Sequence, residues 1–262
     1  ATLISLRFIC DIPGSPAGSW TASGVELRAA EIAAALLLLL VDPGDPAAGF
    51  LATVGGADPA ATVQVLRAAP ERTTGVSLRV VRALITGVGP VEAATQTAVA
   101  LGTLAAINRL PDLVFSLGSA GSRTLDHAAI YQVASVSYRD MDATPLGFAK
   151  GVTPFLGAPA TIPVPHRLSG VPAVSISSGG AVISGARYEG IDAAMVDMET
   201  YAVFRAAQAF GIPMVGLRGI SDVRNELSKL PAWTAYLSEI DAKLAAAVET
   251  FFADVEAGRF RL

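Results

Sequence analysis

The stretch from Ile212 to Asp222 is the feature that most constrains the fold of this chain. It begins Ile-Pro, continues as an apolar run and ends at a carboxylate, which the run Val223-Arg224-Asn225-Glu226 follows. A short apolar run bounded by turn residues is typical of a strand in a buried parallel sheet. Because ligands of open α/β sheets bind at the carboxyl ends of strands, Asp222 is a candidate functional residue. The alternative is that Asp222 only caps a following helix.

Strands and helices alternate along the rest of the chain. Further strands are predicted at residues 3–10, 76–86, 112–117, 130–138 and 173–177. Helices are predicted at residues 25–41, 90–107, 196–210 and 236–255. Residues 43–74 are rich in Ala, Gly and Pro and show no clear pattern, and 154–165 form a Pro-rich excursion. The alternation predicts a mostly parallel sheet in a single α/β domain that spans residues 1–262.

Composition excludes several classes of function. A net charge of −4 and a pI near 5.2 argue against a nucleic-acid binder. One cysteine, Cys10, rules out an intramolecular disulfide, and two histidines make a His-rich zinc site a poor fit. The most apolar run, Ile32 to Val41, is too short to span a bilayer and lacks the features of a signal peptide. The expectation is a cytoplasmic protein without a membrane partner or a metal.

Three further stretches combine residues suited to ligand binding. Gly118 to Ser122 is predicted to be a turn after a strand, where small residues expose backbone N–H groups; an ordinary glycine turn is the alternative. Asp197 and Glu199 stand at a predicted helix start, where acids complement the helix dipole or accept hydrogen bonds from ligand hydroxyls. The loop from Arg139 to Phe148 is interpreted as a solvated loop, a pocket wall or a subunit contact.

Five short motifs occur together in the order and rough spacing of one superfamily. They are Gly87-Val88-Gly89, Ser116-Leu117-Gly118-Ser119-Ala120-Gly121, Tyr138-Arg139-Asp140-Met141-Asp142, Val196-Asp197-Met198-Glu199 and Gly219-Ile220-Ser221-Asp222. Over residues 82–255 the chain resembles the nucleoside phosphorylase/nucleosidase superfamily, and within it the branch of 5′-methylthioadenosine/S-adenosylhomocysteine nucleosidases. Residues 1–80 diverge from that pattern. The resemblance implies a three-layer αβα sandwich around a mixed, partly barrel-like central sheet, assembled as a homodimer or higher homo-oligomer.

The resemblance also implies a reaction and a set of site residues. Nucleosidases of this superfamily hydrolyse an N-glycosidic bond without a metal or a cofactor, and the expected substrate is a 5′-substituted adenosine. Asp222 would act as a general acid that protonates the purine at N7, which requires a raised pKa. Glu199 would hold the ribose hydroxyls. The implied substrate-binding residues are Ser119, Ala120, Gly121, Val182, Ile183, Met198, Glu199 and Ser221.

The nucleophile distinguishes the two branches of the superfamily. Phosphorylases typically hold phosphate with arginines, and Ser116 occupies the position of such an arginine, two residues before the glycine motif. The absence of this arginine favours water as the nucleophile. Arg123, on the other side of the motif, is interpreted as structural. The Glu that activates water in nucleosidases has no clear counterpart, and the candidates are Asp11, Glu26 and Glu31.

The segment expected to read the adenine edge, residues 180–183, departs from the nucleosidase pattern at two positions. Gly180 replaces a common Asp, and Val182 replaces a frequent aromatic residue. Two alternatives to hydrolysis therefore stay open. One is a phosphate-dependent purine nucleoside phosphorylase, and the other is a non-catalytic nucleoside-binding protein.

Overall fold

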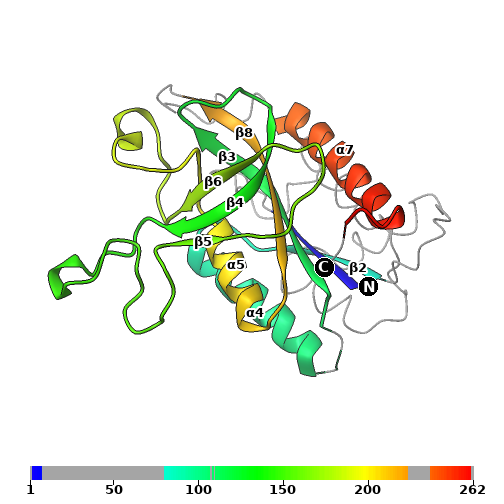
Figure 1. Ribbon diagram of the computed structural model, residues 1–262, viewed down its shortest axis with the longest axis horizontal. Coiled ribbons are helices and arrows are strands. Elements are labelled where there is room, and N and C mark those ends of the chain that lie inside the picture. The colour runs from blue at the N-terminus through cyan, green and yellow to red at the C-terminus, as the bar shows by residue number, and fades with distance from the viewer. Residues whose placement is uncertain (1, 8–79, 107, 109, 224–236, 261–262) are drawn as a thin grey trace, which may run out of the picture.

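The computed structural model describes residues 2–7, 80–106, 108, 110–223 and 237–260 (Figure 1). The predicted helix at 25–41 and the three candidates for water activation, Asp11, Glu26 and Glu31, lie outside these residues. The strands are β1 (Thr2–Arg7), β2 (Val80–Ile85), β3 (Leu113–Ser122), β4 (Ile130–Tyr138), β5 (Thr161–Pro163), β6 (Ala173–Ser178), β7 (Met195–Asp197) and β8 (Met214–Val223). The helices are α4 (Pro90–Ala106), α5 (Thr200–Ala209) and α7 (Leu237–Glu256), with 3-10 turns η2 (Thr144–Leu146) and η3 (Gly185–Tyr188).

The described strands form one mixed sheet of eight strands. Its order is β2-β1-β3-β7-β6-β4-β5, and β8 pairs with both β3 and β4. Strands β3, β7, β6, β4 and β8 therefore close a five-stranded ring. Pairings β3–β7, β4–β5 and β4–β8 are antiparallel and the others are parallel. The expectation of a mixed, partly barrel-like sheet is confirmed, and five of the eight described pairings are parallel, in agreement with the prediction of a mostly parallel sheet.

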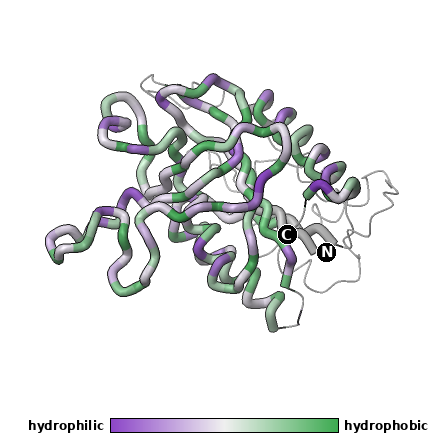
Figure 2. The backbone as a smooth tube through the Cα atoms, viewed as in Figure 1, coloured by the Kyte–Doolittle hydropathy of each residue, from purple (hydrophilic) through white to green (hydrophobic). Residues whose placement is uncertain are grey.

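Helices cover the sheet on two sides, which confirms the three-layer αβα arrangement. Helices α4 and α5 lie together on one side and α7 lies on the other (Figure 1). Helix α7 buries Ile240, Leu244, Val248 and Phe251, and the ring of Phe251 packs 4.9 Å from that of Phe115 in β3. Hydrophobic and hydrophilic residues are interspersed along α7, as an amphipathic helix requires (Figure 2). None of the described helices is long and apolar enough to cross a membrane.

Two local predictions are wrong. The stretch Gly118 to Ser122 is not a turn, because β3 continues to Ser122 and pairs with β8 over this length, with a register shift between Ala120 and Gly121. Close pairing with β8 holds these small residues in an extended strand. The helix predicted from Val196 begins only at Thr200, because Met195–Asp197 is a strand between β3 and β6. In both places sheet pairing overrides local propensity.

Candidate active site

Strand β7 brings two of the predicted site segments together. Val196 pairs with Gly121 of β3, and Gly121 pairs on its other side with Asp222 of β8. Two strand spacings, about 10 Å, therefore separate the backbone of Val196 from that of Asp222. Met198 and Glu199 follow β7 directly. Asp222 thus lies in one of the two strands that flank Gly121, and Glu199 directly follows the other, although they are 23 positions apart in the sequence.

Asp222 lies at the carboxyl end of β8, as the apolar run predicts. Its side chain is half-buried, and burial raises the pKa of the carboxyl above its ordinary value. Two hydroxyls oppose this rise: Ser221 Oγ donates to Oδ1 at 2.9 Å and Tyr188 Oη to Oδ2 at 3.2 Å. A carboxyl with a raised pKa at a strand end is suited to proton transfer.

Gly121 makes room for this carboxyl. A Cβ on Gly121 would lie 2.6 Å from Asp222 Oδ2 and would also meet the hydroxyl of Tyr188. A side chain at position 121 would therefore displace the carboxyl or the phenol. Position 121 therefore requires glycine, because any side chain there would collide with the candidate acid.

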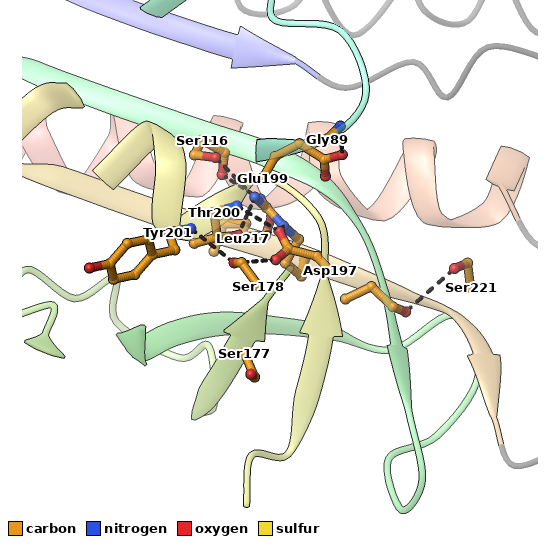
Figure 3. Close-up of polar contacts among 12 residues, drawn as sticks. Gly89, Ser116, Ser177, Ser178, Asp197, Glu199, Thr200, Tyr201, Leu217 and Ser221 are labelled. Atoms are coloured by element: carbon orange, nitrogen blue, oxygen red, sulfur yellow. Dashed lines mark hydrogen bonds and ion pairs between the residues drawn. The ribbon is translucent and has the colours of Figure 1, made fainter. Parts of the chain in front are cut away.

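Glu199 is buried at the N-terminal end of α5, but it does not cap that helix with its side chain. Its Oε1 instead accepts a 2.8 Å hydrogen bond from the backbone N–H of Gly89, in the loop before α4 (Figure 3). Burial first, and the neighbouring Asp197 carboxylate second, raise the pKa of Glu199 to about 7. The helix-dipole interpretation is therefore insufficient, because Glu199 is held by a distant loop beside another acid.

This burial predicts a pH-dependent stability. The carboxyl of Glu199 has a pKa of about 7 when folded and 4.5 ordinarily. The folded state therefore holds the proton more tightly, and the free energy of unfolding falls as the pH rises through that window. Glu199→Gln removes this titration. Between pH 5 and pH 8 we expect urea unfolding to show the variant gaining roughly 2–3 kcal/mol relative to the wild type. Glu239→Gln, on the exposed face of α7, is the control; an equal gain in that variant would contradict the account.

Asp197 lies just before α5, as the sequence predicts, and its Oδ2 accepts a 2.9 Å hydrogen bond from the N–H of Thr200. The same carboxylate also forms a buried ion pair. Its Oδ2 lies 3.2 Å from Nε of Arg218, whose side chain is completely buried. The other N–H groups of Arg218 donate to Ser116 O and Oγ, Leu217 O and Thr200 Oγ1. The five donors of this guanidinium are thus matched by five bonds within the protein. Figure 3 shows Asp197 directed toward Ser178 and Thr200, away from the Gly89 contact of Glu199.

Arg139 fixes the segment expected to read the base. Its guanidinium donates to the carbonyls of Ser177, Gly179, Ala181 and Asp197. The next residue, Asp140, accepts a hydrogen bond from the N–H of Gly180. The start of the loop from Arg139 to Phe148 is therefore a clamp on residues 177–181, whereas Thr144 to Gly147 are exposed. Val182 beyond the clamp is 56% exposed.

The structure gathers most of the predicted site residues around β7 and the end of β8. Ser119, Ala120 and Gly121 lie in β3 beside Gly219, Ile220 and Asp222 of β8. The sequence analysis gave no role to Arg218 or Tyr188, and it left the role of the loop from Arg139 open. A charged residue inside a buried apolar run is a signal for a paired cation, and it was available for Arg218. Among the described residues, no group of three or more His, Cys, Asp or Glu side chains is arranged to hold a metal ion.

Comparisons with known proteins identify the family of this chain. Residues 35–256 match the family model described as the phosphorylase superfamily. A 5′-methylthioadenosine/S-adenosylhomocysteine nucleosidase of Actinobacillus succinogenes is 33% identical over 159 residues, which span 53% of this chain and 66% of that relative. The match thus covers just under two thirds of the relative's length.

Solved structures of nucleosidases share the fold. One from Colwellia psychrerythraea, in complex with adenine, superposes with a TM-score of 0.56 at 23% identity, over 67% of this chain and 78% of that one. One from Neisseria meningitidis, in complex with methylthio-immucillin-A, gives a TM-score of 0.56 at 22% identity, over 67% and 81%. Because the family model matches most of this chain, the chain belongs to the phosphorylase superfamily, a family of nucleoside-cleaving enzymes.

Proposed function

We propose that this protein hydrolyses the N-glycosidic bond of a purine nucleoside, with a 5′-substituted adenosine such as methylthioadenosine or S-adenosylhomocysteine as substrate. The observation that carries the proposal is the half-buried Asp222 carboxyl, held across Gly121 from the strand that leads to Glu199. Nucleosidases among the relatives, and solved nucleosidases that hold adenine or a methylthio-immucillin, support this choice of substrate.

Each group has a distinct part in the proposed reaction. Cleavage leaves positive charge on the sugar and negative charge on the purine, and a proton from Asp222 to N7 neutralises the departing base. The carboxylate of Glu199 accepts hydrogen bonds from the ribose hydroxyls beside Met198. Backbone and small side chains at Ser119 to Gly121, with Ser221, line the floor. Val182 and Ile183 lie against the base.

Water is the proposed nucleophile, and the contacts of two described arginines near the site, Arg218 and Arg139, support this choice. Arg218 contacts Ser116, the position where a phosphorylase has its phosphate-binding arginine, but its guanidinium is buried and neutralised by Asp197. Arg139 is bound to backbone carbonyls. Both terminal nitrogens of each guanidinium therefore already donate within the protein, which leaves no bidentate pair of donors for a phosphate.

The test is release of free base from a panel of nucleosides. The purified protein is incubated with methylthioadenosine, S-adenosylhomocysteine, adenosine and inosine, and the base is followed by chromatography. We expect adenine from the 5′-substituted adenosines. No base from any of the four, with or without phosphate, would reject the enzyme; tight nucleoside binding by calorimetry without product would then favour a binding protein.

Gly121→Ala is expected to impair catalysis more than folding. The new methyl group must push aside the Asp222 carboxyl, and displacement of a catalytic group by about 1 Å costs on the order of 100-fold in rate. Extra volume in a packed site lowers the free energy of unfolding by about 1–2 kcal/mol. Gly102→Ala in α4 is the matched control, because its Cβ would meet only the ring of Phe210 at 3.8 Å. Rates that fall equally in both variants would contradict the steric argument.

A further inference from the structure

A tyrosine from a separate segment holds the proposed acid. Tyr188 ends the 3-10 turn η3, which follows the base-reading segment, and its side chain is buried. Its hydroxyl donates to Oδ2 of Asp222 at 3.2 Å, across 34 residues of sequence. One hydrogen bond therefore joins the proposed acid to the turn that follows the base-reading segment.

The two oxygens of Asp222 have different partners. Oδ1 is bonded by Ser221 Oγ, which also lies 3.4 Å from the carbonyl of Ala120 and can donate there instead. When Oδ1 carries a proton, the Ser221 hydroxyl can therefore accept a hydrogen bond from Oδ1 while it donates one to the carbonyl of Ala120. Oδ2 lies on the side of Gly121, where the missing side chain leaves room for the phenol.

The phenol of Tyr188 remains a donor at any working pH. Burial first, and then the charge of Asp222, raise the pKa of Tyr188 well above its ordinary value. Two neighbouring side chains act on the pair: His127 lowers the pKa of Asp222, and Arg139 lowers the pKa of Tyr188. A fixed donor on Oδ2 leaves Oδ1 as the oxygen that can bear a proton. Once the proton leaves, the bond to the carboxylate becomes charge-assisted and stronger.

We propose that Tyr188 is a positioning residue that keeps Oδ2 of Asp222 as an acceptor, directs the transferable proton to Oδ1 and stabilises the carboxylate left after transfer. This inference rests on the proposed function, in which Asp222 gives a proton to the purine. The proton on Oδ1 moves to N7, and the electron pair of the glycosidic bond goes to the purine. Water then bonds to the anomeric carbon of the sugar and loses a proton, which restores the acid form of Asp222.

Two changes at position 188 test the assignment: Tyr188→Phe removes the hydrogen-bond donor, and 3-fluorotyrosine strengthens it. Loss of a hydrogen bond to a carboxylate is expected to lower kcat roughly tenfold. It should also move the alkaline limb of the pH profile up by about one unit, because the Asp222 proton is held more tightly. Incorporation of 3-fluorotyrosine at position 188 makes the phenol a better donor and should move the limb down. The control is Tyr201→Phe, which changes a buried tyrosine that stacks on Tyr138. This variant should leave the alkaline limb of the pH profile in place.

An alkaline limb that stays in place in both the Tyr188→Phe and the 3-fluorotyrosine proteins would overturn the assignment of Tyr188 as a positioning residue. The 3-fluorotyrosine protein keeps the side chain and so serves even where the Phe variant does not fold.

Titration of the Asp222 carboxyl by ¹³C NMR in the ligand-free protein separates this inference from the proposed function. The Tyr188→Phe protein should titrate about one unit higher than the wild type, whether or not a nucleoside is cleaved. That shift in a protein that releases no base would support the coupling and reject the proposed function. Base release by the wild type with an unshifted Asp222 signal would reject the role of Tyr188.

Discussion

Asp222→Asn is expected to lower the rate of base release from methylthioadenosine by about 1,000-fold. A positioned general acid contributes roughly 10²–10⁴-fold, and an amide in its place cannot give a proton to N7. The free energy of unfolding should change by less than about 1 kcal/mol, because the side chain is only half-buried and the amide oxygen still accepts a hydrogen bond. Asp192→Asn, at an exposed position after η3, is the matched control and should retain the wild-type rate.

A substrate with a precharged leaving group sharpens this experiment. A purine nucleoside methylated at N7 departs as a neutral base without a proton, so the variant should cleave it nearly as fast as the wild type does. The expected signature is loss of activity on methylthioadenosine with retention on the methylated nucleoside. A variant that keeps a tenth or more of the wild-type rate on methylthioadenosine would remove Asp222 from the mechanism.

Asp197→Ala is expected to lower the free energy of unfolding by about 3–5 kcal/mol. Removal of one partner of a buried ion pair leaves the other charge without compensation, and the guanidinium of Arg218 has no exposed surface. The variant also loses the bonds that Asp197 accepts from Ser178 Oγ at 2.6 Å and from Thr200 N at 2.9 Å. Urea unfolding followed by circular dichroism measures the change.

The comparison for Asp197→Ala is a pair of the same kind at the surface. On α7, Oε1 of Glu239 lies 2.7 Å from Nζ of Lys243, and both side chains are about half exposed. Glu239→Ala should change the free energy of unfolding by less than about 0.5 kcal/mol. A cost below about 1 kcal/mol for Asp197→Ala would show that the buried pair contributes little to the folded state.

Elements whose pattern depends on burial alone were predictable from the sequence. The strand Ile130–Tyr138 has the predicted bounds, and α7 begins and ends within one residue of the prediction. The carboxyl end of β8 also places Asp222 as the apolar run indicates. Periodicity and turn residues determine these elements locally.

Features that depend on contacts between distant segments were not predictable. Gly118 to Ser122 forms a strand only because β8 pairs with it. Nothing in the sequence near Tyr188 indicates that its hydroxyl reaches Asp222, and the Gly89 bond to Glu199 joins residues 110 positions apart. The polar network of the site is therefore a property of the closed sheet, whereas the identities of its acids are visible in the motifs.

Phosphate dependence of methylthioadenosine cleavage tests the central claim most directly. The wild-type protein is assayed in phosphate-free buffer and again with added phosphate, and both the base and the sugar product are identified. We predict adenine and an unphosphorylated methylthioribose at the same rate in both buffers. Base release that requires phosphate and yields a sugar 1-phosphate would contradict hydrolysis and assign the protein to the phosphorylase reaction.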